Sequence, residues 1–320
     1  MGDATPVLSA LADFGTGAGG PLMSEHRFGG DWTEIKLAKL EKYLRAYRTI
    51  FSGNPRARHF RTWYVDAFAG TGSRTRTDTP RVSPSALFGS DVYEDVDTKR
   101  YRDGSAKIAV ALPDPFDNYL FIDKSAGRIK ELERAIETER PALHPRCAFE
   151  HGDANDVLKQ WCRERDWTKE RAVVFLDPYG MQVEWGMVAT LGATKAVDLW
   201  YLFPLGVGVA RLLTRDGNID ESWAKRLDTT FGTKDWRSRF YETTQQEGLF
   251  GQMETVERDA SEENIQGFIN ERLRTCFAGV AKGRILRNSK SNPMYSLCFA
   301  AANEKGAPTA IRIAKDILSD

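Results

Sequence analysis

The sequence predicts an α/β fold in which helices cover both faces of a mostly parallel sheet. Short apolar runs alternate with amphipathic stretches over residues 31–205, a rhythm typical of parallel strands joined by helical crossovers. An acidic residue follows or ends several of these runs. Near the end of the chain, apolar runs at 276–286 and 294–302 flank a polar turn, which predicts an antiparallel hairpin at the sheet edge.

The expected helices and strands follow from two kinds of hydrophobic pattern. Apolar residues at steps of three and four predict a first helix over residues 34–51: Leu37, Leu40, Tyr43, Leu44 and Tyr47. Apolar, β-branched and aromatic runs predict five strands, at 60–68, 118–123, 147–150, 171–177 and 195–203. Helices are expected at 104–112, at 124–139 and from the GDAND segment to Trp161, and a helix or loop at 181–191.

Three stretches depart from this rhythm. Residues 1–30 are rich in small residues and are interpreted as a mobile lead-in, whose GTGAGG segment follows no strand and lacks the lysine of a phosphate-binding loop. Residues 73–103 form a long polar excursion. Residues 206–275 are charged and aromatic without a clean strand and are predicted to be a mainly helical insertion. The Rossmann-like domain therefore comprises residues 31–205 and 276–320.

Composition excludes several classes of protein. The chain has 45 basic and 45 acidic side chains, so no global field attracts nucleic acid or anionic lipid. The longest apolar run is too short to span a bilayer. The four cysteines are far apart, and the histidines lack metal-ligand spacing, so no metal site is expected. Without a secretory signal, the cytoplasm is the expected compartment.

Charge is nevertheless concentrated locally. Residues 32–81 hold eleven basic side chains, from Lys36 to Arg81, against four acidic ones, a balance of +7. A solvated helix face is one interpretation of the basic residues in the first helix. Contact with the phosphates of a nucleic acid beside the active site is the other.

The first candidate site follows the first strand, in YVDAFAGTG. Gly70 and Gly72 let the backbone approach a ligand closely, and Phe68 lies in the same loop. Asp66, just before the loop, can accept a hydrogen bond from a ligand ammonium such as the amino-acid end of S-adenosylmethionine (SAM). A tight turn without a ligand is the alternative.

Two further acidic residues follow the next strands. Asp123 closes the second strand, where one carboxylate can accept from both hydroxyls of a ribose. Asp153 and Ala154 come just after the third strand, where the carboxylate can accept from the exocyclic amine of adenine. For Asp153, simple helix capping is the rival interpretation.

The fourth candidate site is the Asp-Pro-Tyr-Gly turn after the fourth strand. The Asp177 carboxylate and the Pro178 carbonyl can accept hydrogen bonds from an exocyclic amine and so counter the delocalisation of its lone pair into the ring. The Tyr179 ring can stack on the base. Asp-Pro turns are also common without any ligand.

The ordered set of segments resembles the three-Cys-motif partner proteins, a bacterial and phage-borne family grouped with SAM-dependent methyltransferases. The resemblance rests on WTEIKLAKLEKYLRAY (32–47), YVDAFAGTG (64–72), GSAKIAVAL (104–112), FIDK (121–124), GDAND (152–156), FLDPYG (175–180), LFP (202–204) and PMYSLCFAAAN (293–303). It implies a class I methyltransferase fold and a partner protein, encoded nearby, that carries the three-Cys motif. One proline of the Asp-Pro-Pro-aromatic motif of amino-methyltransferases is missing here.

Two functions are therefore expected, in order. The first is SAM-dependent methylation of a nitrogen, with a nucleobase in RNA or DNA as the acceptor and residues 36–81 guiding its phosphates. The second is a non-catalytic interaction protein that keeps the methyltransferase fold as a scaffold. A nucleotide-dependent oxidoreductase fits less well, because Asp123 lies 51 residues after Gly72 instead of the usual ~20.

Overall fold

The computed structural model describes residues 32–70, 104–248 and 251–319, and only the backbone of 243–248 and 251–255. The expected lead-in at 1–30, the polar excursion at 73–103, Gly72 and the arginines at 74, 76 and 81 lie outside the described residues. Within the described ranges, every helix is too short or too polar to cross a lipid bilayer. The four cysteines are free, and no group of three or more metal-ligand side chains was found in these ranges.

The centre of the fold is one seven-stranded sheet in the order β3-β2-β1-β4-β5-β9-β8. Its strands are β1 (Arg61–Asp66), β2 (Asn118–Asp123), β3 (Cys147–His151), β4 (Glu170–Leu176), β5 (Val197–Phe203), β8 (Gly279–Arg287) and β9 (Pro293–Ala301). The first five are parallel, whereas β9 runs antiparallel to β5 and to β8. The predicted mostly parallel sheet with a C-terminal antiparallel hairpin is therefore confirmed.

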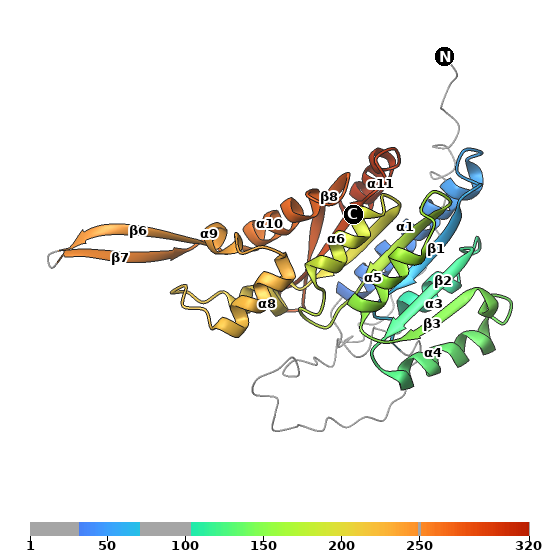
Figure 1. The fold of residues 1–320 in the computed structure, drawn as a ribbon, viewed down its shortest axis with the longest axis horizontal. Coiled ribbons are helices and arrows are strands. Elements are labelled where there is room, and N and C mark those ends of the chain that lie inside the picture. Colours follow the sequence, from blue (N-terminus) through green and yellow to red (C-terminus); the bar gives the residue numbers. More distant parts are fainter. Residues whose placement is uncertain (1–31, 71–103, 249–250, 320) are drawn as a thin grey trace, which may run out of the picture.

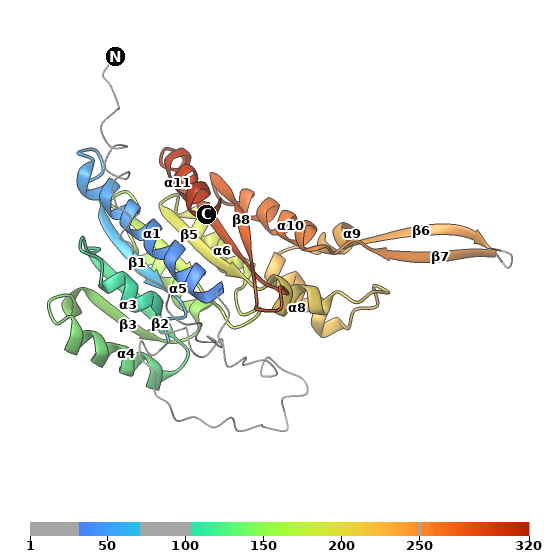
Figure 2. The ribbon, with the colours of Figure 1, turned by 180° about the vertical axis from the view of Figure 1, so that it is seen from behind.

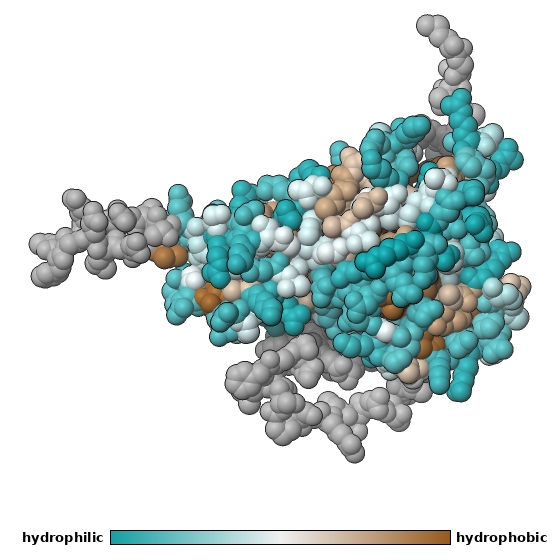
Figure 3. Space-filling view, viewed as in Figure 1, coloured by the Kyte–Doolittle hydropathy of each residue, from teal (hydrophilic) through white to brown (hydrophobic). Residues whose placement is uncertain are grey.

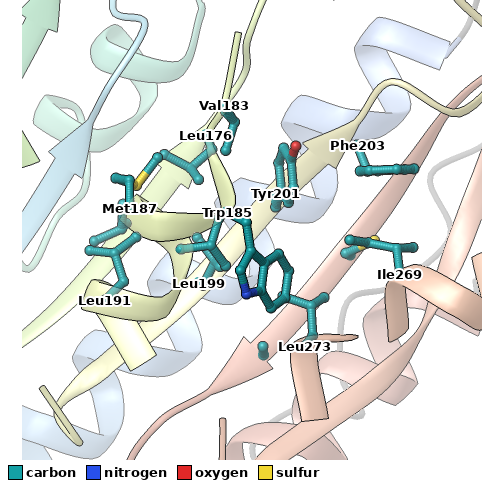
Figure 4. Packing of buried hydrophobic residues seen from close by; sticks show 14 of the residues in the cluster. Leu176, Val183, Trp185, Met187, Leu191, Leu199, Tyr201, Phe203, Ile269 and Leu273 are labelled. Atoms are coloured by element: carbon teal, nitrogen blue, oxygen red, sulfur yellow. The ribbon is translucent and has the colours of Figure 1, made fainter. Parts of the chain in front are cut away.

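Helices cover both faces of this sheet (Figure 1, Figure 2). One face packs against α1 (Trp32–Gly53), α3 (Ser105–Val110), α4 (Ala126–Glu139) and α11 (Ala307–Ser319). The other packs against α5 (Ala154–Glu164), α6 (Trp185–Ala193), α8 (Glu221–Phe231), α9 (Trp236–Phe240) and α10 (Glu262–Arg274). Figure 4 shows this second core, where Met187, Tyr201 and Leu273 come from α6, β5 and α10. Burial on both faces explains why the strands are apolar without polar alternation.

The segment after β5 contains a feature that the sequence did not predict. A π-helical turn (Leu205–Val209) and the short α7 (Ala210–Leu212) lead to α8 and α9. Then β6 (Tyr241–Gly248) and β7 (Gly251–Arg258) form a two-stranded antiparallel sheet. The expectation that 206–275 holds no clean strand is wrong. Thr, Gln and Glu dominate this ribbon, so it lacks the apolar period that marks a half-buried strand.

This ribbon, which we call the arm (residues 241–258), extends away from the main sheet in both ribbon views (Figure 1, Figure 2). Its base is anchored by Tyr241, whose hydroxyl donates to the Thr214 carbonyl at 2.7 Å. The large apolar side chains that are exposed in the described chain are Trp223 on α8 and Val256 on the arm, at 42% and 36%. Figure 3 shows a largely hydrophilic face with small apolar areas.

Three basic side chains of α1 are buried, whereas Lys42 and Arg45 of the same helix are exposed. Lys36, Lys39 and Arg48 are only 3%, 5% and 8% exposed. Lys39 Nζ donates to the Ile317 carbonyl, and Arg48 Nη1 donates to Thr62 Oγ1 at 2.5 Å. These side chains therefore hold α1 to its own fold and form neither a solvated face nor a phosphate-contacting one.

Candidate active site

The carboxyl ends of the parallel strands bring the predicted site residues to one edge of the sheet. From β1 the chain continues outward through β2 to β3, and it then returns to β4 on the other side of β1. Ligands of such sheets bind where the strand order reverses, here beyond the ends of β1 and β4. Asp66 ends β1, Asp123 ends β2 and Asp177 follows β4 directly. The structure thus places all three carboxylates at that edge.

These three carboxylates also point to the same face of the sheet. Each follows by two positions an aromatic residue of the core beneath α1: Tyr64, Phe121 and Phe175. Side chains alternate between the faces of a strand, so residues two apart share a face. In the sheet register, Asp66 lies opposite both Phe121 and Phe175, so Asp123 and Asp177 each lie two residues farther along their own segments. The site is therefore built on the face that α1 covers.

Asp66 is fully buried, and this burial raises its pKa to about 6. A hydrogen bond with the Ser105 side chain opposes the shift, and the negative charge of Asp177 adds to it. Two further hydrogen bonds lower the pKa of Asp66 more weakly. The Phe68 N–H donates to Oδ1 at 3.2 Å, and the Tyr64 hydroxyl donates to Oδ2 at 3.3 Å. Asp66 and Asp177 thus interact electrostatically, which favours a positive charge beside them.

The loop after β1 turns at Gly70, whose φ is +65°. This left-handed conformation is costly for a residue with a Cβ. The Gly70 N–H donates to Asp123 Oδ2 at 3.1 Å, and the Ala69 N–H donates to the Ile122 carbonyl at 2.9 Å. The loop is therefore held against the end of β2. Phe68, by contrast, is half-buried against the core on the opposite face of the sheet.

Asp123 connects this loop to α4. Its Oδ1 accepts from the Ser125 N–H at 2.7 Å and from Arg128 Nε at 3.0 Å, while Oδ2 accepts from Gly70. The residue is 4% exposed. A carboxylate oxygen can accept two hydrogen bonds, so Oδ2 retains capacity for one more donor.

Asp153 caps helix α5. Its Oδ1 accepts from both the backbone N–H and the side-chain amide of Asn155, each at 2.9 Å. Burial opposes ionisation, but these hydrogen bonds and the charge of Lys124, 3.6 Å from Oδ2, lower the pKa of Asp153. The capping interpretation is thus what the structure shows for Oδ1. Ala154 is buried and begins the helix, so its N–H is among those left without an intrahelical partner.

Asp177 forms a buried ion pair with Lys36 of α1. Lys36 Nζ lies 2.6 Å from Asp177 Oδ2, and the two side chains are 3% and 11% exposed. Pro178 is buried and Tyr179 is half-buried behind it. The turn ends at Gly180, where φ is +59°. The predicted Asp-Pro-Tyr-Gly turn therefore presents its carboxylate toward α1.

Neighbouring elements hold the segment after this turn. Gln182 Oε1 accepts from the Tyr179 N–H at 3.1 Å, and the Gln182 carbonyl accepts from Asn155 Nδ2 at 3.0 Å. Arg226 of α8 donates to the Met181 carbonyl at 3.3 Å. The segment following β4 is thus fixed from α5 and from the segment after β5.

Sequence reasoning missed three residues that the structure brings to this site. Ser105 interacts with Asp66, Lys36 with Asp177, and Arg226 with the loop that follows Asp177. For Lys36 a signal existed, because it lies four positions after Trp32 and four before Leu40, both buried on the same helix face. Ser105 and Arg226 had no comparable local signal.

Comparison with known proteins gives only distant structural matches. No protein-family model and no curated protein sequence matches the chain. Among solved structures, protein LPL1258 of Legionella pneumophila is 11% identical with a TM-score of 0.42, and the match covers 92% of this chain and 93% of that one. A putative SAM-dependent methyltransferase of Listeria monocytogenes is 11% identical with a TM-score of 0.37, covering 84% and 96%. A SAM-dependent methyltransferase of Clostridium acetobutylicum is 12% identical with a TM-score of 0.37, covering 83% and 92%.

Proposed function

We propose that this protein is a SAM-dependent methyltransferase that modifies an exocyclic amine of a nucleobase in RNA or DNA. The observation that carries the proposal is the pair of interacting carboxylates, Asp66 and Asp177, at the point where the strand order reverses. One would face the cofactor and the other the acceptor. Their separate hydrogen-bond partners support this division of roles.

The residues on the β1 and β2 side fit SAM. The amino group of SAM is positive, and a cation beside the buried Asp66 would stabilise the ionised form of this carboxylate. Gly70 allows close approach of the ligand, and Asp123 Oδ2 can accept from a ribose hydroxyl. Asp153 and the N–H of Ala154 would face the adenine. When bound, SAM supplies a methyl group activated by its sulfonium.

The residues after β4 fit a planar amine. Asp177 Oδ2 is occupied by Lys36, which leaves Oδ1 and the Pro178 carbonyl to accept from the amine. Tyr179, half-buried in the same turn, would supply an aromatic ring for stacking on a base. Catalysis would then depend on alignment of the acceptor nitrogen with the methyl group, for which effective molarities of about 10⁵ M or more are known.

Calorimetry and mass spectrometry test the proposal together. We expect the purified protein to bind SAM and S-adenosylhomocysteine at one site. We also expect nucleic acid from cells with the active protein to carry a methylated base that is missing from cells without it. The control is Asp66→Ala with Asp123→Ala. A folded wild-type protein that binds neither ligand would reject the proposal.

The arm supports a second candidate function, that of an interaction scaffold. An isolated two-stranded sheet is marginally stable in water, and its outer strand edges can pair with another chain. The resemblance to three-Cys-motif partner proteins supports such a partner and a bacterial or phage origin. Failure to bind SAM combined with partner binding through the arm would favour the scaffold.

A further inference from the structure

We propose that Lys36 is a positioning residue for the methyl acceptor: by holding Asp177 Oδ2, it directs Oδ1 toward the acceptor amine. This inference rests on the proposed function and adds to it a residue from α1, far from the loops that carry the predicted site. The contact joins residues 141 positions apart, at 2.6 Å. Among the residues that the structure describes, Asp177 Oδ1 has no hydrogen-bond donor of its own.

The position of Lys36 is well determined by its surroundings. Its Nζ lies 5.4 Å from the centre of the Trp32 ring, which in turn contacts the Tyr295 ring at 5.2 Å. Farther along α1, Lys39 donates to the Ile317 carbonyl, and the Tyr43 hydroxyl donates to Asp198 at 2.6 Å. With α1 anchored at these points, the ammonium has little freedom to leave the carboxylate.

Stability alone is a weak reason for such a pair. A buried ion pair is often no more stabilising than well-packed apolar residues of the same volume. Here the pair lies at the switch point of the sheet, beside a second carboxylate whose protonation depends on the charge of Asp177. The location of the ion pair is explained if Lys36 orients Asp177 and balances its charge.

Asparagine at position 177 gives a sharp test, because its amide has one accepting and one donating end. In Asp177→Asn, Lys36 fixes the amide oxygen toward itself, so the NH₂ group faces the acceptor amine and two donors meet. In Lys36→Met with Asp177→Asn, the amide is free to turn its oxygen to the acceptor. We therefore expect the double variant to be more active than Asp177→Asn alone.

The assay measures transfer of tritium from methyl-labelled SAM to bulk RNA and DNA prepared from cells that lack this protein. We expect kcat of Asp177→Asn to fall about 100-fold, in the range for loss of one well-placed hydrogen bond at a reacting group. The kcat of the double variant should be at least about 10-fold higher than that of Asp177→Asn, which corresponds to removal of one mismatched hydrogen bond. SAM affinity, measured by calorimetry, should stay within about 3-fold in both variants, since no residue in the described part of the cofactor loop, 67–70, hydrogen-bonds to the pair.

A matched control is Lys315→Met, which removes an exposed lysine from α11, a helix on the same face of the sheet. It should leave kcat, SAM affinity and thermal unfolding unchanged. Thermal unfolding of Lys36→Met, Asp177→Asn and the double variant completes the cycle, and the double variant should be more stable than Lys36→Met because no charge remains unpaired. Thermal unfolding can be measured without knowing the methyl acceptor.

The outcomes separate the two proposals. A wild-type protein that binds no SAM rejects the proposed function and this inference with it. If the wild-type protein transfers methyl groups but the double variant is no more active than Asp177→Asn, only the role of Lys36 is rejected. A loss of SAM binding in the double variant would also reject it, since the pair would then support the fold of the whole site.

Discussion

Lys36 Nζ and Asp177 Oδ2 lie 2.6 Å apart in the core, and they join the first turns of α1 to the turn that follows β4. Both side chains are nearly inaccessible to solvent, at 3% and 11% exposure. Removal of one member of such a pair leaves a buried charge without compensation. The pair therefore determines how the candidate acceptor loop responds to mutation.

Under the proposed function, Asp177→Ala should abolish methyl transfer while SAM binding persists, because the carboxylate would hold the acceptor amine. The single variant should also lose about 3–5 kcal/mol of unfolding free energy, since Lys36 remains buried and unpaired. Lys36→Met with Asp177→Ala avoids this loss and is the variant of choice for kinetics. Methyl transfer retained in the double variant would contradict the role of Asp177.

SAM binding should depend on the ionisation of Asp66. Its pKa is raised to about 6, so the carboxylate is protonated at pH 5 and ionised at pH 7. Because only the ionised form attracts the SAM ammonium, affinity should rise with pH, by up to about 10-fold per unit below pH 6, and level off above it. Calorimetry between pH 5 and 8 measures this. In Asp66→Asn the SAM affinity should be weak and should not rise with pH over this range. If this variant shows the same pH dependence as the wild-type protein, Asp66 does not bind the SAM ammonium.

The same group should make folding stability fall with pH. The folded state holds the Asp66 proton up to about pH 6, whereas the unfolded chain loses it near 3.8, so the stabilisation by this proton is lost between these values. The difference amounts to about 3 kcal/mol at most. Asp198 is a matched control, since burial also raises its pKa to about 6 but it lies near the amino end of β5. Asp198→Asn should change the pH dependence of thermal unfolding without changing SAM affinity.

Gly70→Ala should weaken SAM binding through the loop backbone. At φ +65° an alanine costs about 1–2 kcal/mol, and relief of this strain would displace the N–H that donates to Asp123. We expect about a 10-fold loss of SAM affinity, in line with that cost. Gly180→Ala is the control: φ is +59° with open space around a Cβ, so it carries a similar backbone cost away from the cofactor loop. Equal effects of both variants on SAM affinity would contradict the prediction.

Removal of the arm should leave the main fold and SAM binding intact. Tyr241 and Arg258 are paired in the sheet register, so a two-residue Gly-Gly turn can join them after residues 242–257 are deleted. We expect the unfolding midpoint to change by no more than about 4 °C, because the deleted residues are mostly polar. Gel filtration and thermal unfolding measure this. If the variant does not fold, the arm is part of the core and is no separate interaction element.

Sequence and structure agree where the determining physics is local. Burial on one face gives the helices their hydrophobic period, and burial on both faces makes the parallel strands continuous apolar runs. These local patterns identified the five parallel strands and the C-terminal hairpin, and so the acidic residues at the ends of β1, β2 and β4. The arm was missed because its strands are mostly polar and show neither pattern.

What the sequence determined by itself is therefore the order of the elements and the candidate carboxylates at their ends, because hydrophobic periodicity and turn residues act between near neighbours. Only the tertiary structure decided that Lys36 is buried against Asp177 and that Asp66 and Asp177 share one charge environment. A lysine on an amphipathic helix is normally solvated. Its burial depends on a carboxylate supplied from 141 residues away, and no local pattern encodes that meeting.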